Sequence, residues 1–161
     1  MCTFVENMFV GIISGMVSGW IITQIYRNID KKIDRFEYIN ELAVYAYEFS
    51  EQFFYIGEPE IPDEYIMSLS DFIIKGTLPR RKKWVKLTKG EEMICNDFIC
   101  FYNESLKKIL TCKLNIQNVQ KGELKYADEV VNSKLFISGV MRLEAVMHWN
   151  KLNEIRKNYI G

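Results

Sequence analysis

The hydrophobic and polar positions divide the chain into an uncharged opening segment and a longer amphipathic remainder. Residues Met8 to Ile25 carry no charge and are mostly large and apolar. As a helix rising about 1.5 Å per residue, this segment reaches ~27 Å, close to the hydrocarbon thickness of a bilayer. The pattern therefore predicts a transmembrane helix within residues 1–26 and a helical domain over residues 27–161.

One face of the predicted span carries only small or polar side chains. At about 100° per residue, this face consists of Asn7, Gly11, Ser14, Gly15, Ser18 and Gly19. Small residues four positions apart allow helix backbones to approach closely in lipid. We expect copies of the span to associate through this face, which would also present the polar groups to the lumen of a pore.

Three other interpretations compete for the same segment. An apolar run of this kind also occurs in buried helices of soluble proteins, although its length and the basic flank after it favour a span. A cleaved signal peptide normally has a basic start and a small-residue cleavage site, whereas this chain has Glu6 before the apolar run and no such site after it. Small residues four apart also arise by chance, so the face alone does not establish self-association.

The charges around the span predict its orientation. Arg27, Lys31, Lys32 and Arg35 follow the apolar segment, and no basic residue precedes it. The positive-inside rule then places the N-terminus outside and residues 27–161 in the cytoplasm, as in a single-pass protein of the inner (cytoplasmic) membrane. The four irregularly spaced cysteines are expected to be reduced thiols there.

Helical spacing continues without proline or glycine from Tyr26 to Ile56, so we expect the span to run on into the cytoplasmic domain. Gly57 and Pro59 then end the helix. Asp30, Asp34 and Glu37 stand three to four residues from basic side chains and are expected to form intrahelical ion pairs. The stripe expected to face other helices is Ile39, Leu42, Ala46, Phe49, Phe53 and Ile56.

Three further helices are predicted, which makes the fold all-α with a bundle of about four helices. A short helix over residues 64–74 has Asp63 as its expected N-cap and ends at Gly76. Residues 88–114 form a second helix, in which Thr88 and Glu91 fit a capping box. Its expected apolar side is Met93, Ile94, Phe98, Phe101, Leu106 and Ile109.

The remainder of the chain is expected to be a loop and one very long helix. Residues 114–122 are polar and predict the loop. Residues 123–160 lack proline and keep apolar residues at helical spacing, with a bend expected at Ser138 and Gly139. A helix of this length exceeds what a small domain needs for itself, so part of it is expected to pack on neighbouring subunits.

The only strongly biased charge run is KGTLPRRKKWVKLTK, from Lys75 to Lys89, with seven basic residues and no acid. One interpretation is contact with anionic lipid headgroups, with Trp84 at the interface. A second is a phosphate-bearing ligand held by the forked donors of Arg80 and Arg81. The third is a solvated loop or short hairpin that balances the acidic loop before it. The candidate binding residues are Arg80, Arg81, Lys82, Lys83, Trp84 and Lys86.

The residues predict neither an enzyme nor a cofactor or metal site. His148 is the only histidine and stands beside Trp149 on a predicted helix, where packing is the usual role. Cys95 and Cys100 are too widely spaced for a zinc knuckle, so the cysteines of the helices are expected to be buried thiols. The 21 basic and 21 acidic side chains cancel, so sequence-specific nucleic-acid binding is not expected.

The segment GIISGMVSG, followed by an uninterrupted helix into a helical domain, resembles the single-span effector subunits of bacterial anti-phage defence systems. This resemblance concerns the layout of the whole chain and includes no diagnostic motif. It implies a channel-type effector that depolarises the membrane when triggered. It also implies a cognate nucleotidyltransferase or sensor protein bound to the cytoplasmic domain.

Two functions therefore remain open from the sequence. In the first, the chain is a gated pore, and a homo-oligomer is required because a dimer of single spans does not readily enclose a path. A tetramer is favoured on that ground. In the second, the span is an oligomeric anchor or scaffold, and the cytoplasmic helices dock a soluble partner. The small-residue face is compatible with both functions, since glycine permits close packing and serine tolerates water.

Overall fold

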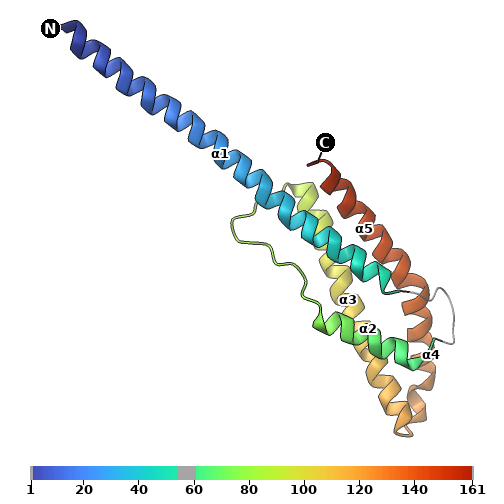
Figure 1. The fold of residues 1–161 in the computed structure, drawn as a ribbon. Helices are drawn as coiled ribbons and strands as arrows, with labels where there is room; N and C mark the ends of the chain where they lie inside the picture. The colour runs from blue at the N-terminus through green and yellow to red at the C-terminus, as the bar shows by residue number, and fades with distance from the viewer. Residues whose placement is uncertain (1, 54–60, 161) are drawn as a thin grey trace.

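The computed structural model describes residues 2–53 and 61–160, with side chains from residue 13 onward. Over these residues the protein is all-helical and contains no strand, which confirms the predicted all-α class. The elements are α1 (Cys2–Glu51), α2 (Asp63–Lys75), α3 (Lys89–Gln120), a 3-10 turn (Leu124–Tyr126), α4 (Ala127–Phe136), a π-helical turn (Ile137–Met141) and α5 (Arg142–Lys157) (Figure 1).

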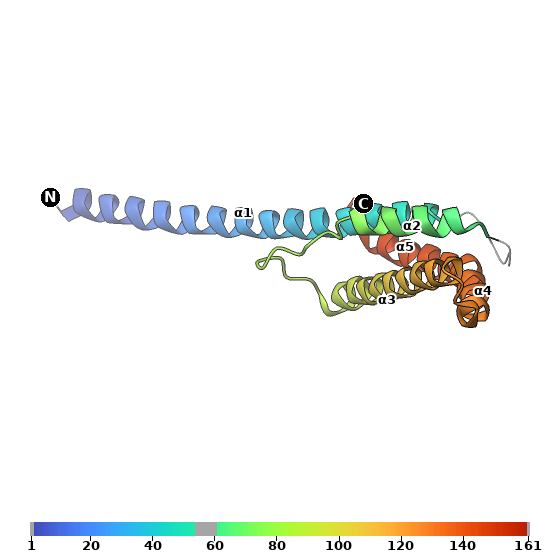
Figure 2. The same ribbon diagram turned by 90° about the horizontal axis from the view of Figure 1, so that it is seen from below.

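The first helix is continuous for 50 residues, and the lack of proline and glycine from Tyr26 onward predicts that the span runs on into the domain. Its N-terminal half projects away from the other helices, and its C-terminal half packs among them (Figures 1 and 2). The predicted stripe is buried from Ile39 to Phe53. The helix itself ends at Glu51, before the predicted end at Ile56, so Phe53 lies just after it. Ile56, the last predicted member of the stripe, lies outside the described residues.

The second helix begins at Asp63, so the prediction that Asp63 is its N-cap is wrong. Pro62 occupies the cap position with extended backbone and forms no side-chain cap hydrogen bond. The Asp63 carboxylate instead accepts from Lys134 Nζ on α4 at 2.6 Å, and Lys134 also donates to the Ile61 carbonyl at 2.7 Å. The Asp63 carboxylate thus pairs with a residue distant in the sequence and does not cap the helix.

Gly76 follows α2, as predicted, and its lack of a side chain is required by the packing. A Cβ atom at this position would lie 2.5 Å from the Tyr45 hydroxyl of α1. That hydroxyl is itself held in place, because it donates to the Tyr102 hydroxyl of α3 at 2.9 Å. Tyr102 in turn donates to the Ile73 carbonyl of α2 at 3.3 Å, so one chain of hydrogen bonds joins three helices.

The third helix begins with the predicted capping box between Thr88 and Glu91. It continues to Gln120, so the predicted loop over residues 114–122 is wrong. Ile116 is buried within this segment, and Asn115 Nδ2 donates to Glu129 Oε2 on α4 at 3.0 Å. The actual turn follows at Gly122, whose φ of 95° favours glycine.

The apolar side predicted for the third helix is partly confirmed. Phe98, Phe101 and Ile109 are buried. Met93 is exposed, because it lies on the outer side of the first turns of α3. Ile94 and Leu106 are only partly buried and pack against the edge of the core.

The predicted long C-terminal helix is present from Ala127 to Lys157, interrupted by the π-helical turn. That turn includes Ser138 and Gly139, the two residues at which a bend is predicted. A π-helical turn commonly marks the insertion of an extra residue into an α-helix. The segment before Ala127 forms a 3-10 turn, so the helix begins later than expected.

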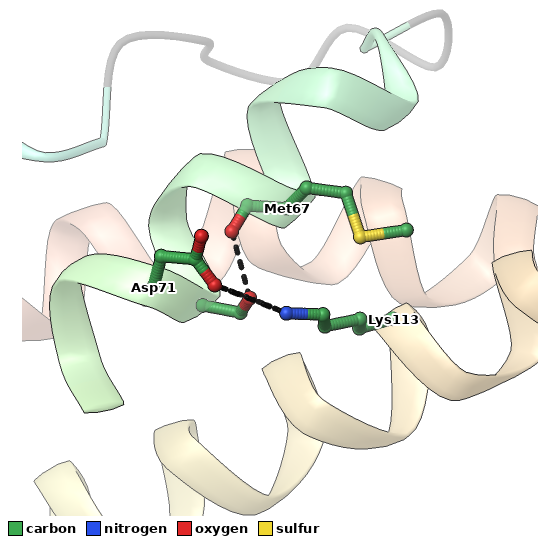
Figure 3. Close-up of polar contacts among 4 residues, drawn as sticks. Met67, Asp71 and Lys113 are labelled. Carbon is green, nitrogen blue, oxygen red and sulfur yellow. Dashed lines mark hydrogen bonds and ion pairs between the residues drawn. The ribbon is translucent and has the colours of Figure 1, made fainter. Parts of the chain in front are cut away.

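Ion pairs at the helix surfaces add to the apolar core. Lys113 of α3 reaches across to α2, where its Nζ lies 3.1 Å from Asp71 Oδ1 and donates to Ser70 Oγ at 2.9 Å (Figure 3). This contact lowers the pKa of the Asp71 carboxyl, chiefly through the hydrogen bond from Lys113. The α2–α3 pair is thus joined by polar contacts in addition to the buried side chains beneath them.

Candidate functional site: the projecting arm and the basic loop

The arm, defined as residues 13–33 of α1, extends beyond the bundle as a single helix (Figures 1 and 2). Gln24 is partly covered, and all the other arm residues are exposed. Large apolar side chains are exposed along it, including Met16 at 71% and Trp20 at 65%. Burying such side chains usually stabilises a protein by about 1.5–3 kcal/mol each. The arm of an isolated chain therefore carries apolar surface for which that chain offers no partner.

The small-residue face lies on this free helix and contacts no other helix of the chain. Ser14, Gly15, Ser18 and Gly19 are all exposed. A Cβ atom built on Gly15 or Gly19 would have no other atom within 4 Å. Asn7 and Gly11, the other two predicted members, precede the residues whose side-chain surroundings the structure describes.

Over the side chains that the structure describes, no helix contains a stretch both long and apolar enough to cross a membrane. Residues 8–12, the first part of the predicted span, lie outside that range.

The basic loop, residues 76–88, connects α2 to α3 and runs beside α1 (Figure 1). Its tip contacts α1 at the base of the arm. Trp84 Nε1 donates to Asp34 Oδ2 at 3.1 Å, and Lys82 Nζ lies 3.8 Å from Glu37 Oε2. Asp34 and Glu37 therefore bind the loop, and the prediction that they form intrahelical ion pairs is wrong.

Other basic side chains of the loop differ in their surroundings. Arg81 Nη1 lies 2.8 Å from Glu92 Oε1 on α3, and this hydrogen bond raises the pKa of the Arg81 guanidinium. Arg80 lines a small recess with Asp34 and Glu37. Lys83 and Lys86 are exposed. The acids that contact the loop thus lie on α1 and α3. The sequence interpretation named the acidic segment before α2 for this role.

A second polar cluster, which we call the collar, lies where the arm enters the bundle. It consists of Arg35 and Phe36 of α1, Glu91 of α3, and Tyr159 after α5. The Tyr159 hydroxyl donates to Glu91 Oε1, and Arg35 Nη1 lies 3.9 Å from Glu91 Oε2. The Phe36 and Tyr159 rings are 6.1 Å apart. The collar therefore connects the base of the arm to two other parts of the bundle.

Glu91 has a role in the collar that the sequence did not reveal. Partial burial disfavours its charge, but hydrogen bonds from Tyr159 and Thr88 outweigh this and leave the pKa of the Glu91 carboxyl below its usual value. The capping box identified Glu91 as a local helix cap. Its contact with Tyr159 depends on the tertiary fold, and no sequence spacing indicates it.

His148 packs against an aromatic side chain, consistent with the predicted packing role. Its ring is stacked on Phe101 with a centroid distance of 4.8 Å and an interplanar angle of 17°. Burial lowers the pKa of the His148 imidazole, so the neutral ring is favoured. This contact accounts for the position of the ring through packing alone.

The described cysteines are free thiols. Cys95 and Cys112 are buried, as predicted, and burial raises the pKa of their thiols to about 12 and about 11. Cys100 is exposed, so the prediction of burial is wrong for this residue. Within the described part of the chain, no group of three or more histidine, cysteine or acidic side chains is arranged to hold a metal ion.

Comparisons with protein-family models, with curated proteins and with solved structures gave no match.

Proposed function

We propose that this protein is an oligomeric single-pass membrane protein of the inner (cytoplasmic) membrane and acts as a gated pore that depolarises the membrane when triggered. Anti-phage defence is the setting that the layout of the chain favours. The observation that carries the proposal is the continuity of α1, which joins an uncharged segment to the bundle core without a break. A stiff helix of this kind transmits rotation or tilt from the bundle to the arm.

The exposure of the small-residue face supports self-association as the means of forming the pore. Space is open at Gly15 and Gly19, so a neighbouring helix can approach the backbone closely. Ser14 and Ser18 lie on the same face and would present hydroxyl groups to a lumen. A tetramer is favoured because a ring of spans, unlike a pair, encloses a path through the bilayer.

The collar and the basic loop are the proposed sites of control. Both contact α1 within a few residues of one another, at Asp34, Arg35, Phe36 and Glu37. A cognate nucleotidyltransferase or sensor protein that displaces either contact would change the constraint on the base of the arm. Anionic lipid is the proposed partner of the exposed lysines Lys83 and Lys86.

The pore function is tested by measuring membrane potential in cells that express the full chain or its variants under forced activation. Gly15→Leu places a bulky side chain on the small-residue face and should abolish depolarisation. Val17→Leu adds bulk on the other face of the helix and should leave depolarisation intact. Normal potential with the wild-type chain under forced activation, or equal depolarisation by both variants, would contradict the proposal.

An anchor or scaffold is the second candidate function, and an exposed apolar row at the junction of the π-helical turn and α5 favours it. Val140, Leu143 and Met147 are three to four residues apart and are 40, 65 and 56% exposed. Such a row suits docking of a soluble partner. Replacing residues 1–25 by an unrelated single-pass helix should preserve function if the segment is only an anchor. Loss of function after the exchange would argue against this candidate.

A further inference from the structure

The apolar side chains of α1 that lie after the predicted span form a stripe, which we define as Tyr26, Ile29 and Ile33. These side chains are 63, 46 and 50% exposed and stand three and four residues apart. Positions at this spacing lie on one side of a helix. Charged residues surround the stripe from Arg27 to Arg35. Water therefore reaches an apolar row in an otherwise polar part of the helix.

The same side of α1 remains open in part within the bundle. Val44 follows Ile33 after three helical turns and is 42% exposed. A surface groove of about 460 Å³ lies beside Val44, between α1 and Pro79 of the basic loop. One edge of this side is occupied, since Phe36 and Tyr47, each three residues after a member of the row, pack against aromatic rings of the C-terminal segment. A helix lying along the stripe can therefore reach Val44 only along the other edge, on the side of the groove.

The stripe is also aligned with the small-residue face. Gly15, Ser18 and Ile22 precede Tyr26 at intervals of three and four residues. The series from Gly15 to Ile33 therefore follows one side of α1, with the three- and four-residue spacing typical of helices that pack along their length. A helix that contacts the small-residue face in lipid reaches the stripe when it continues outside the lipid.

The charges beside the stripe select the partner and its direction. Asp30 lies on one edge of the stripe and Lys32 on the opposite edge, and both are exposed. In a parallel, in-register pair of identical helices, opposite edges meet, so Asp30 of each copy lies near Lys32 of the other. In an antiparallel pair, like edges meet and like charges repel. The complementarity therefore favours a second copy of this chain in the parallel orientation.

We propose that the stripe is a self-association seam, on which the α1 helix of a second copy packs in parallel and in register from the arm to Val44. This inference rests on the self-association in the proposed function but does not require a pore. It places the contact between copies directly beside the collar and the basic loop. A change in either can then alter how neighbouring arms meet.

The seam is tested by disulfide cross-linking of the full chain in membranes, in a background with Cys2→Ser and Cys100→Ser. Single cysteines are introduced as Ile29→Cys, Ile33→Cys and Val44→Cys on the seam, and as Lys31→Cys on the opposite side of α1. After mild oxidation, the three seam variants should form covalent dimers and Lys31→Cys should not. Val44→Cys tests whether the two helices are parallel. In an antiparallel pair centred on the arm, position 44 of one copy would lie far from position 44 of the other.

Equal cross-linking at Lys31→Cys and at the seam positions would overturn the inference, and so would the absence of dimers at Ile29→Cys and Ile33→Cys. Dimers at these two positions without dimers at Val44→Cys would overturn the parallel arrangement. Membrane potential, measured in the same cells, separates this result from the pore function. Depolarisation without seam cross-links would contradict the seam and support the pore function. Seam cross-links without depolarisation would contradict the pore function and support the seam.

Discussion

The two halves of α1 belong to one unbroken helix but have opposite surroundings. In the C-terminal half, Phe49 is fully buried and its ring contacts those of Phe53, Phe101 and Tyr102 at centroid distances of 5.1, 6.1 and 5.3 Å. In the arm, Trp20 is about as large and is 65% exposed. The bundle therefore buries most of the apolar side chains of the C-terminal half of α1 within a single chain, and it leaves those of the arm exposed.

This difference shows that the chain itself covers one half of the helix and leaves the other half exposed. Helices in proteins are stabilised mostly by packing of an apolar face, and an isolated helix gains little from propensity alone. The arm has apolar side chains around much of its circumference, and in the proposed function lipid and further copies of the chain cover them.

The largest expected contrast is between core and arm truncations. Phe49→Ala should destabilise the bundle by about 3–5 kcal/mol, because it leaves a cavity among packed aromatic rings. Ile21→Ala, on the arm and away from the seam, should change stability by less than about 0.5 kcal/mol. Unfolding in detergent followed by circular dichroism measures both. Equal losses would show that the arm is packed against its own bundle.

A glycine pair gives a smaller and more local contrast. Gly76→Ala should destabilise by about 1–3 kcal/mol, because the added methyl meets the hydrogen-bonded Tyr45 hydroxyl. Gly90→Ala, in the first turn of α3 where space is open, should be neutral or stabilise by up to about 1 kcal/mol. The same unfolding assay applies. A neutral Gly76→Ala variant would contradict the close packing of α1 against the end of α2.

The collar predicts an acid-dependent contribution to stability. The pKa of Glu91 is lower in the folded protein than its ordinary value of 4.5, so its stabilising effect is present above that pH. It is lost as the pH falls through the lower, folded pKa. Glu91→Gln should cost on the order of 1 kcal/mol near neutral pH and reduce the fall of Tm with acid.

Glu104→Gln, at an exposed acid of the same helix outside the collar, is the matched control variant. Identical pH profiles for the wild-type chain and Glu91→Gln would contradict the role assigned to Glu91. If Glu104→Gln reduced the acid dependence of Tm as much as Glu91→Gln does, the loss of any negative charge, and not the collar, would account for the effect.

A small effect on stability is also expected at the basic loop, where the ion pairs are largely exposed. Changing Arg80, Arg81, Lys82 and Lys83 to serine should cost no more than about 1 kcal/mol. The same variant should bind anionic liposomes more weakly than the wild-type chain. Lys121→Ser with Lys125→Ser is a control at exposed lysines outside the loop. Unaltered liposome binding would exclude the lipid interpretation and leave the phosphate-ligand and solvated-loop interpretations.

Local patterns in the sequence predicted much of the fold. The absence of proline and glycine after Tyr26 predicted that α1 continues into the bundle, the spacing of Ile39 and Phe49 predicted its buried side, and Thr88 with Glu91 predicted the start of α3. The prediction of a loop over residues 114–122 was wrong because it rested on their polar composition. One of these polar residues, Asn115, donates a hydrogen bond to Glu129 of α4 within the fold. Polarity marks a loop only where no partner is available for the polar groups.

The candidate site was less predictable because its contacts join distant residues. Composition identified the basic loop, but its contacts with Asp34 and Glu37 depend on how α1 passes beside it. Similarly, nothing near Tyr159 in the sequence indicates its bond to Glu91. Helical periodicity indicated which arm residues share a side, whereas it could not indicate that the bundle leaves this side uncovered.

The proposal that the arm lies in lipid and contacts other copies of the chain can be tested directly. The most direct measurement is the mass of the full-length assembly purified from membranes in detergent, determined by light scattering with correction for bound detergent. We expect a membrane-extracted assembly of four or more chains. A chain that remains monomeric and stays in solution without detergent would contradict the proposal.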